Sequence, residues 1–345
     1  MPTTTLSRSR PRKALRLAMA FIVTLVFLAV LALIGALMLG GPKVTPPLQS
    51  ISDPFKGVSF EAMPAVSRFS ARDGTQLAYR HYAAADGAGL RGSVMLVHGS
   101  SANGQSVHPL AQSFAAAGYA VYAFDIRGHG ASGEKGRIGY VGQLDDDLED
   151  FVNVMRPATP RTLLGFSSGG GFALRVAGSP RGAQFDNFLF MSPYVHHMAV
   201  TNRSKDSAGW VSVGIPRLVA LATLNRVHIT RFNHLPVINF AIADNPKADL
   251  TPWYAYALAV NFLPRNDYLG DIRSIGGPAE VIVGQDDELF LADKFRTLFD
   301  EAGRQDIPVT AVPATGHMAL TLSDAGRAAA VAAVNRLGAR SAGSH

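Results

Sequence analysis

The feature that most constrains the fold is the stretch 161–175, with the sequence RTLLGFSSGGGFALR. An apolar run comes first, small residues follow, and an apolar pattern with helical spacing ends the stretch, so we expect a strand, a sharp turn and a helix. The turn at 165–169 fits G-x-S-x-G, with Ser167 at its centre. Its glycines let the strand and helix approach closely while the serine takes a strained backbone conformation. Ser167 is therefore the candidate nucleophile.

Strand-like and helix-like patterns alternate along most of the chain. A hairpin is expected at 66–82, where Asp73-Gly74 is a strong turn pair. Continuous apolar runs predict buried strands at 93–97, 119–124, 188–191, 279–283 and 309–312. Apolar residues at helical spacing predict helices at 107–117, 144–155, 291–302 and 325–337. The alternation predicts an α/β fold with a mostly parallel central sheet and helices on both faces.

Residues 17–41 form a long apolar run without a charge, and about 20 apolar residues suffice for a helix to cross a bilayer. Basic residues precede it with no acid among them: Arg8, Arg10, Arg12, Lys13 and Arg16. This pattern predicts a cytoplasmic N-terminus and a domain on the extracytoplasmic side, periplasmic or outer. The alternative is a cleaved signal peptide, which has a shorter apolar core of about 7–15 residues. The same basic residues account for most of the net charge of +6, so nucleic-acid binding gains little support.

Residues 192–271 interrupt the alternation. This segment is rich in aromatic residues and prolines, contains no strong strand run and shows helical patches, so it is interpreted as a lid over the site. The predicted organisation, in chain order, is a basic cytoplasmic N-terminus (1–16), a transmembrane anchor (17–41), a proline-rich tether (42–64), the first part of the core (65–191), the lid insertion (192–271), the second part of the core (272–338) and a flexible tail (339–345).

Candidate partners for Ser167 follow two later strands. In parallel sheets, reactive groups collect at the carboxyl ends of the strands. His317 comes after the last predicted strand and is the candidate base. Asp287 comes after the strand before it and is the candidate acid that orients the imidazole, with Asp286 and Glu288 as alternatives.

Other polar residues are assigned supporting roles. Asp125, Arg127 and His129 are expected to brace loops beside the site by hydrogen bonds. The pair His196-His197 lacks a third ligand nearby, so no metal site and no cofactor are expected. The chain has no cysteine, which excludes disulfides, thiolate chemistry and cysteine-bound metals.

Taken together, these motifs resemble the α/β-hydrolases, and in particular the group of monoglyceride lipases, lysophospholipases and serine aminopeptidase-like enzymes. The resemblance covers about residues 66–337 and rests on His98-Gly99, Asp125-x-Arg127-Gly128-His129-Gly130-x-Ser132, Gly165-Phe166-Ser167-Ser168-Gly169, Gly284-x-x-Asp287 and Gly316-His317. It implies Ser167 as nucleophile, Asp287 as acid and His317 as base. The expected oxyanion hole uses the backbone N–H groups of Ser100 and Ser168.

The chain departs from the monoglyceride lipases at one point. Ser-Ser-Ala-Asn follows His98-Gly99, where those enzymes frequently have a glutamate and a histidine. The sequence predicts a membrane-anchored serine hydrolase that cleaves carboxylic esters, with a small-molecule ester or a lipid of the acyl-glycerol or lysophospholipid type as substrate. One alternative is amide cleavage, as in aminopeptidase-like relatives. Another is a non-catalytic, membrane-tethered binding protein on the same scaffold.

Overall fold

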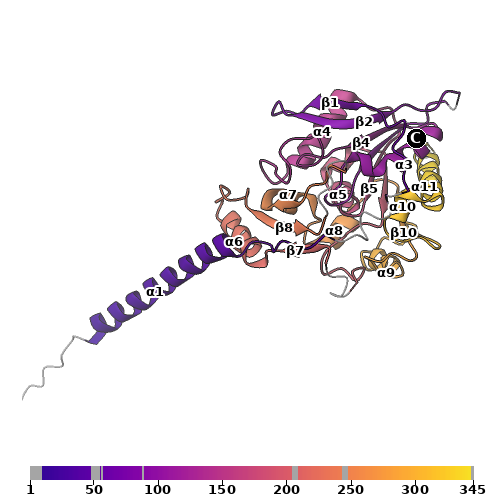
Figure 1. Ribbon diagram of the computed structural model, residues 1–345. Helices are drawn as coiled ribbons and strands as arrows, with labels where there is room; N and C mark the ends of the chain where they lie inside the picture. Colours follow the sequence, from indigo (N-terminus) through magenta and orange to yellow (C-terminus); the bar gives the residue numbers. More distant parts are fainter. Residues whose placement is uncertain are drawn as a thin grey trace, which may run out of the picture.

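An eight-stranded sheet forms the centre of the globular body (Figure 1). The computed structural model describes residues 10–342 except 48–54, 56, 88, 204–208 and 243–247. The strand order is β1-β2-β4-β3-β5-β6-β10-β11. The bounds are β1 (Val66–Ser70), β2 (Gln76–Tyr82), β3 (Ser93–Val97), β4 (Ala120–Phe124), β5 (Arg161–Phe166), β6 (Asn187–Met191), β10 (Ala279–Gly284) and β11 (Val309–Val312). All neighbouring pairs from β4 to β11 are parallel, and β2 pairs antiparallel with β1 and β4, which confirms the predicted mostly parallel sheet.

Side chains of the central strands enter two separate cores. In β3, Met95 and Val97 pack into one core, and Val94 and Leu96 pack into the other, because successive side chains of a strand point to opposite faces. The first core includes residues of α4 (Gln143–Met155), α5 (Ser168–Ala177) and α9 (Lys294–Glu301). The second includes residues of α3 (His108–Ala116), α10 (Ala319–Leu322) and α11 (Asp324–Ala342). Two short 3₁₀ helices, η2 (Gly104–Val107) and η3 (Pro180–Gln184), complete the core segments.

The predicted lid insertion contains strands as well as helices. Its elements are β7 (Val211–Val213), α6 (Ile215–Arg226), β8 (Pro236–Phe240), β9 (Trp253–Ala255), α7 (Tyr256–Phe262) and α8 (Tyr268–Arg273). The three strands form a small antiparallel sheet in the order β7-β8-β9. The expected helical patches are present as α6, α7 and α8, but the insertion also contains three short strands that were not expected. β7 and β9 are three residues each, too short for a recognisable alternation of apolar and polar residues.

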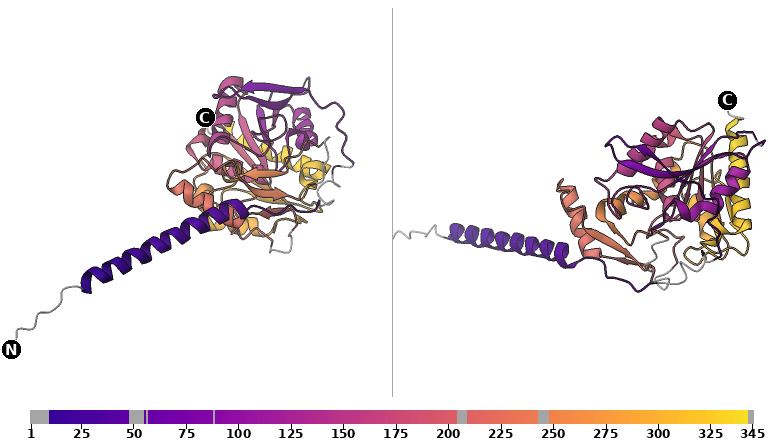
Figure 2. Two further views of the ribbon diagram at one scale, coloured as in Figure 1. Left: turned by 60° about the vertical axis from the view of Figure 1, so that its left-hand side comes forward. Right: turned by 45° about the horizontal axis from the view of Figure 1, so that its top comes forward.

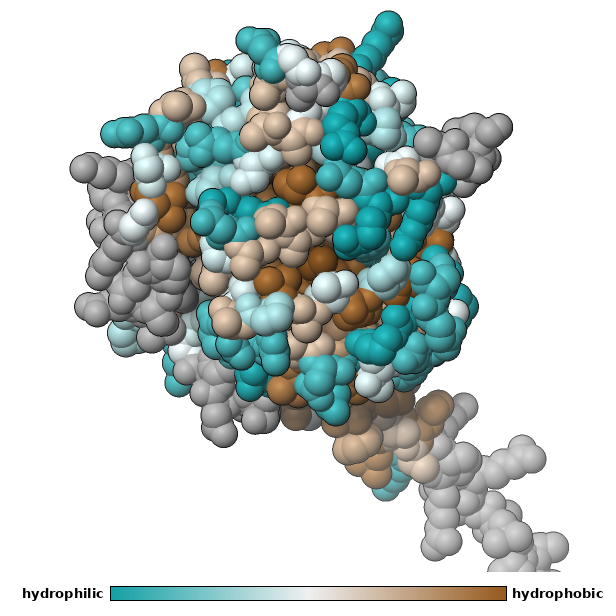
Figure 3. Space-filling view, turned by 90° about the vertical axis from the view of Figure 1, so that its right-hand side faces the viewer, coloured by the Kyte–Doolittle hydropathy of each residue, from teal (hydrophilic) through white to brown (hydrophobic). Residues whose placement is uncertain are grey.

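The helix α1 (Arg10–Leu39) projects from the globular body (Figures 1 and 2). Its segment Lys13–Leu39 is long and apolar enough to span a membrane, and none of its most apolar stretch is buried within the protein. In the space-filling view, α1 extends behind the body and is coloured largely hydrophobic, whereas the facing surface mixes polar and apolar side chains (Figure 3).

The C-terminal boundary differs from the predicted one. α11 continues to Ala342, so residues 339–342 are helical and the expectation of a tail from 339 is wrong for them. The sequence of this last turn, ARSA, contains no glycine or proline that would end a helix. Residues 1–9 of the basic N-terminus, 48–54 and 56 of the tether, and 343–345 lie outside the described residues.

Candidate active site

Ser167 occupies the turn between β5 and α5. Its backbone dihedral angles, φ 55° and ψ −121°, lie in a region that residues with side chains rarely adopt. Gly165 and Gly169 make this turn sterically feasible. A Cβ at Gly165 would lie 2.0 Å from the carbonyl oxygen of Gly169, and one at Gly169 would lie 2.3 Å from that of His98. The glycines of the motif are therefore required because backbone segments meet there.

The three residues singled out from the sequence are linked by hydrogen bonds. Nε2 of His317 lies 3.0 Å from Oγ of Ser167, and Nδ1 of His317 lies 2.8 Å from Oδ2 of Asp287. His317 and Asp287 are buried, whereas Ser167 is partly exposed. The rings of Phe166 and Phe290 pack against the imidazole, with centroid distances of 4.8 and 5.3 Å. One hydroxyl is thus presented to solvent with a fixed imidazole behind it.

The carboxylate of Asp287 is held on both oxygens. Besides the bond to His317, its Oδ1 accepts hydrogen bonds from the backbone N–H groups of Leu289 and Phe290, each at 2.9 Å. Burial alone would raise the pKa of Asp287, but these hydrogen bonds and the attraction to His317 hold the pKa below its ordinary value. Asp287 is therefore ionised at neutral pH.

The two alternative acids lie differently. Asp286 and Glu288 are both exposed. The side chain of Glu288 accepts a hydrogen bond from the backbone N–H of His317 at 2.8 Å, so it supports the histidine loop without touching the imidazole nitrogens. Of the three acids weighed from the sequence, the structure brings Asp287 to the imidazole.

Ser100 and Ser168 lie side by side next to Ser167. Their hydroxyl oxygens are 2.5 Å apart. Ser168 is the first residue of α5, and N–H groups in the first turn of a helix have no intrahelical acceptor. The loop after β3 approaches the turn closely, because a Cβ at Gly99 would lie 3.3 Å from the Cβ of Ser167. Both loops from which an oxyanion hole is expected thus meet at the candidate nucleophile.

The sequence of the chain also matches a known protein family. The sequence profile described as serine aminopeptidase, S33, matches residues 88–322, well over half of the chain and the whole interval from the loop after β3 to α10. The chain belongs to the serine aminopeptidase S33 family.

Relatives of this S33 chain include lipases. A monoacylglycerol lipase of Mycolicibacterium smegmatis is 44% identical over 87 residues, which make up 24% of this chain and 30% of that lipase. Two solved structures share the α/β-hydrolase fold. A monoglyceride lipase of Saccharomyces cerevisiae has a TM-score of 0.62 at 15% identity, covering 83% of this chain and 98% of that one. A monoacylglycerol lipase of Paleococcus ferrophilus has a TM-score of 0.56 at 20% identity, covering 76% and 98%.

The loop after β4 braces the site of the S33 chain without reaching Ser167. The guanidinium of Arg127 bridges Asp147 on α4, at 2.7 and 2.8 Å, and Asp73 in the β1–β2 turn, at 2.8 and 3.1 Å. Oδ1 and Oδ2 of Asp125 accept hydrogen bonds from the backbone N–H groups of Gly104 and Ala131. These contacts agree with the expected supporting role.

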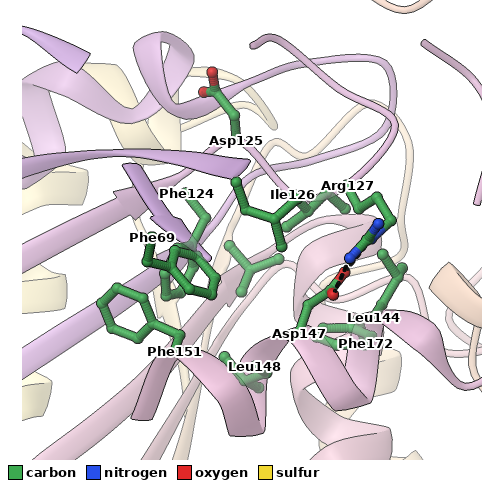
Figure 4. Close-up of a pocket in the computed structure, with 12 residues that line it drawn as sticks. Phe69, Phe124, Asp125, Ile126, Arg127, Leu144, Asp147, Leu148, Phe151 and Phe172 are labelled. Atoms are coloured by element: carbon green, nitrogen blue, oxygen red, sulfur yellow. Dashed lines mark hydrogen bonds and ion pairs between the residues drawn. The ribbon is translucent and has the colours of Figure 1, made fainter. Parts of the chain in front are cut away.

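A small cavity lies beside this bracing loop. Figure 4 shows the ion pair of Arg127 and Asp147 at one end of the cavity and the phenylalanine rings of Phe69, Phe124 and Phe151 at the other. Its volume is about 30 Å³, and none of Ser167, Asp287 and His317 lines it. A space of this size holds about one water molecule and belongs to the core.

Sequence reasoning missed two side chains that contact the site. Tyr254, on β9 of the lid, is buried; its hydroxyl accepts a hydrogen bond from the backbone N–H of Ser101 and lies 2.6 Å from Nε2 of His129. Arg203 donates two hydrogen bonds, at 2.7 and 3.0 Å, to the carbonyl oxygen of Asp287. Neither residue belongs to a motif that points to hydrolase chemistry, and both reach the site only through the path of the lid insertion.

His196 and His197 lie next to each other in the lid insertion. Their rings are 4.1 Å apart, and His196 stacks on Tyr268 of α8 with a centroid distance of 5.0 Å. Within residues 10–342, the described His, Asp and Glu side chains include no cluster of three that could hold a metal ion. His196 thus packs on Tyr268 within the lid insertion itself.

Proposed function

We propose that this S33-family chain is a serine hydrolase that cleaves carboxylic esters, with Ser167 as nucleophile, His317 as base and Asp287 as orienting acid. The observation that carries the proposal is the continuous hydrogen-bonded series from Ser167 through His317 to Asp287, set on a strained turn. Three side chains from widely separated positions meet in the geometry that activates a hydroxyl.

The proposed reaction passes through an acyl-enzyme. Oγ of Ser167 attacks the ester carbonyl while Nε2 of His317 takes its proton, and His317 then gives that proton to the leaving alcohol. Asp287 stabilises the imidazolium without taking the proton. The N–H groups of Ser100 and Ser168 hold the negative charge on the carbonyl oxygen. Water, deprotonated by His317, then attacks the acyl group, releases the acid and restores Ser167.

We further propose a lipid-like substrate, of the acyl-glycerol or lysophospholipid type, and anchoring of the enzyme by α1 with the hydrolase on the extracytoplasmic side. The local similarity to a monoacylglycerol lipase supports an acyl substrate. The apolar segment Lys13–Leu39 supports the anchor, and the basic residues that precede it support a cytoplasmic N-terminus. An anchor of this kind would keep the site close to a bilayer.

Labelling with a fluorophosphonate probe tests the nucleophile. We expect the wild-type chain to be labelled, Ser167→Ala not to be labelled, and Ser67→Ala, on the edge strand β1, to be labelled like the wild type. Hydrolysis of p-nitrophenyl esters of increasing acyl length, measured on the same proteins, then reports the acyl preference. Failure of the wild-type chain to react under conditions that label a known serine hydrolase would instead favour a binding protein on this scaffold.

Amide cleavage is the second candidate, and the description of the matching family as a serine aminopeptidase favours it. The same three residues can attack an amide, in which case His317 protonates a leaving amine. Parallel assays with aminoacyl p-nitroanilides and with esters separate the two reactions. A higher kcat/KM on the anilides would make the chain a peptidase.

A further inference from the structure

The C-terminal end of α1 is fixed to the lid insertion. Arg217 of α6 donates hydrogen bonds to the carbonyl oxygens of Leu37 and Met38, at 2.8 and 3.1 Å, and to that of Pro236 at the start of β8, at 2.9 Å. Carbonyl groups in the last turn of a helix lack intrahelical donors and carry partial negative charge, so a guanidinium stabilises this end. One side chain thus joins α1 to two lid elements.

The residues after α1 continue this attachment. The backbone N–H of Lys43 donates to the hydroxyl of Ser212 on β7 at 2.9 Å, and Thr45 contacts the side-chain oxygen of Asn239 on β8 at 3.3 Å. Gly214 also packs against this segment, since a Cβ there would lie 2.6 Å from the carbonyl carbon of Gly41. The orientation of the lid relative to α1 is therefore set by direct contacts rather than by a loose linker.

From β7 to just beyond α6, the same part of the lid exposes several aliphatic side chains, here together called the lid apolar face. Its members are between 38% and 63% exposed: Val211, Val213, Ile215, Val219, Val227 and Ile229. Ile215 and Val219 lie one helical turn apart on α6, opposite the buried Leu221 and Leu224. In the right-hand view of Figure 2, α6 lies across the end of α1 rather than along it. A membrane perpendicular to α1 would therefore run beside α6.

The charge of the same segment has one sign. Residues 209–242 contain three arginines and two histidines but no acidic residue. Arg226 and Arg231, which flank Val227 and Ile229, are exposed. Exposed aliphatic side chains bordered by arginines are the composition of segments that lie in the interface of a bilayer with anionic lipids.

We propose that the lid apolar face rests in the interfacial layer of the bilayer that α1 spans, with Arg226 and Arg231 among anionic headgroups. The inference rests on the proposed anchoring by α1 and does not depend on the hydrolase activity. Two observations favour lipid as the occupant: the lid apolar face belongs to the lid elements that contact the end of α1, and the charged residues of 209–242 are all basic. Since Tyr254 of the same insertion contacts the loop of Ser100 and Ser101, the docked lid places the cover of the site on the bilayer surface.

The absence of cysteine from the chain makes a direct test available, because a single introduced cysteine carries the probe. Three variants of the full chain, Val219→Cys, Val26→Cys and Val154→Cys, are labelled with an environment-sensitive fluorophore. They are reconstituted in vesicles of phosphatidylcholine and phosphatidylglycerol that contain lipids spin-labelled near the headgroup or deep in the acyl chain. Val26, on α1, reports the anchor. Val154 is an exposed valine on α4 and reports a surface away from the lid.

The expected result has three parts. The probe at 219 shifts to the blue and is quenched by the shallow spin label, the probe at 26 is quenched by the deep label, and the probe at 154 is quenched by neither. In Arg217→Gln, quenching at 219 falls while quenching at 26 stays. Replacing phosphatidylglycerol by phosphatidylcholine also lowers the quenching at 219.

Several results would overturn the proposal. A probe at 219 that stays unquenched while the probe at 26 is quenched would show an anchored chain with a lid in water. A blue shift at 219 without lipid quenching would show a protein partner, such as a second copy of the chain. An unquenched probe at 26 would remove the anchor on which the proposal rests. Fluorophosphonate labelling of the same samples reports the hydrolase activity separately. A failure of the proposed function can therefore be distinguished from a failure of the proposed lid docking.

Discussion

At the scale of single residues, Asp287 and Asp286 differ in environment although they are adjacent. Asp287 is buried and hydrogen-bonded to His317, whereas Asp286 is exposed. We expect Asp287→Asn to lower kcat on an ester by a factor on the order of 10⁴. The amide of asparagine would favour the wrong tautomer of the imidazole and would not stabilise the imidazolium that forms during the reaction. Asp286→Asn should stay close to the wild type. Steady-state kinetics on p-nitrophenyl butyrate measures both, and similar losses in the two variants would contradict the assignment of the acid.

Tyr254 links the lid to the loop that carries Ser100. Removal of its hydroxyl in Tyr254→Phe leaves the buried N–H of Ser101 without this acceptor, at a cost of about 1–3 kcal/mol in the free energy of unfolding. We also expect kcat to fall more than KM changes, since the oxyanion is formed only during the reaction. Tyr256→Phe, two residues further along, is the matched control. Should Tyr254→Phe lose stability but keep its kcat, the tyrosine would serve folding alone.

At the scale of elements, the turn between β5 and α5 depends on Gly165. A Cβ at this position would lie 2.0 Å from a backbone oxygen, so we expect Gly165→Ala to displace the turn, to lower the urea midpoint and to abolish fluorophosphonate labelling. Gly338, in α11, has nothing within 4 Å of an added Cβ. Gly338→Ala should therefore stabilise the protein by about 0.5–1 kcal/mol and leave labelling intact. Equal effects of the two substitutions would show that close backbone packing is not the reason for the glycine at 165.

The elements differ in how far the sequence predicts them. Strands such as β3 are predictable because they are buried on both faces and read as continuous apolar runs. The strands β7 and β9 of the lid are not predictable in this way, because three residues are too few to show an alternation of apolar and polar side chains. Their pairing with β8 is decided by tertiary packing. The same distinction applies to the site. The order of Ser167, Asp287 and His317 along the chain could be recognised, whereas the contact of Tyr254 with Ser101 depends on how the insertion folds back.

At the scale of the whole molecule, the core and the lid meet at a buried polar contact. His98 follows β3, His129 lies in the loop after β4, and Tyr254 comes from the lid. The two imidazole rings are 4.9 Å apart, and His129 contacts the hydroxyl of Tyr254 at 2.6 Å. These groups are fully enclosed, so a proton added to either imidazole would place a charge where no water can solvate it.

This enclosure predicts how stability depends on pH. Burial lowers the pKa of His98 to about 4, and burial together with the neighbouring His98 lowers that of His129 well below its ordinary value. In the unfolded chain both residues titrate near about 6.5. Above that pH the two imidazoles are neutral in both the folded and the unfolded chain, so they contribute no pH dependence to the stability. Below that pH the unfolded state binds more protons than the folded state. The free energy of unfolding therefore decreases as the pH is lowered, by up to about 1.4 kcal/mol per pH unit for each histidine.

Urea unfolding in detergent micelles, followed by tryptophan fluorescence between about pH 7 and pH 5, measures this slope. We expect the wild-type chain to lose stability steadily below about pH 6.5. His129→Gln keeps a polar partner for Tyr254 but cannot titrate, so its free energy of unfolding should depend less steeply on pH. His234→Gln, the same substitution at an exposed lid position, is the matched control. Equal slopes in all three proteins would mean that the histidines at the junction of core and lid already exchange protons with solvent in the folded state, and the enclosure of the junction by the lid would have to be abandoned.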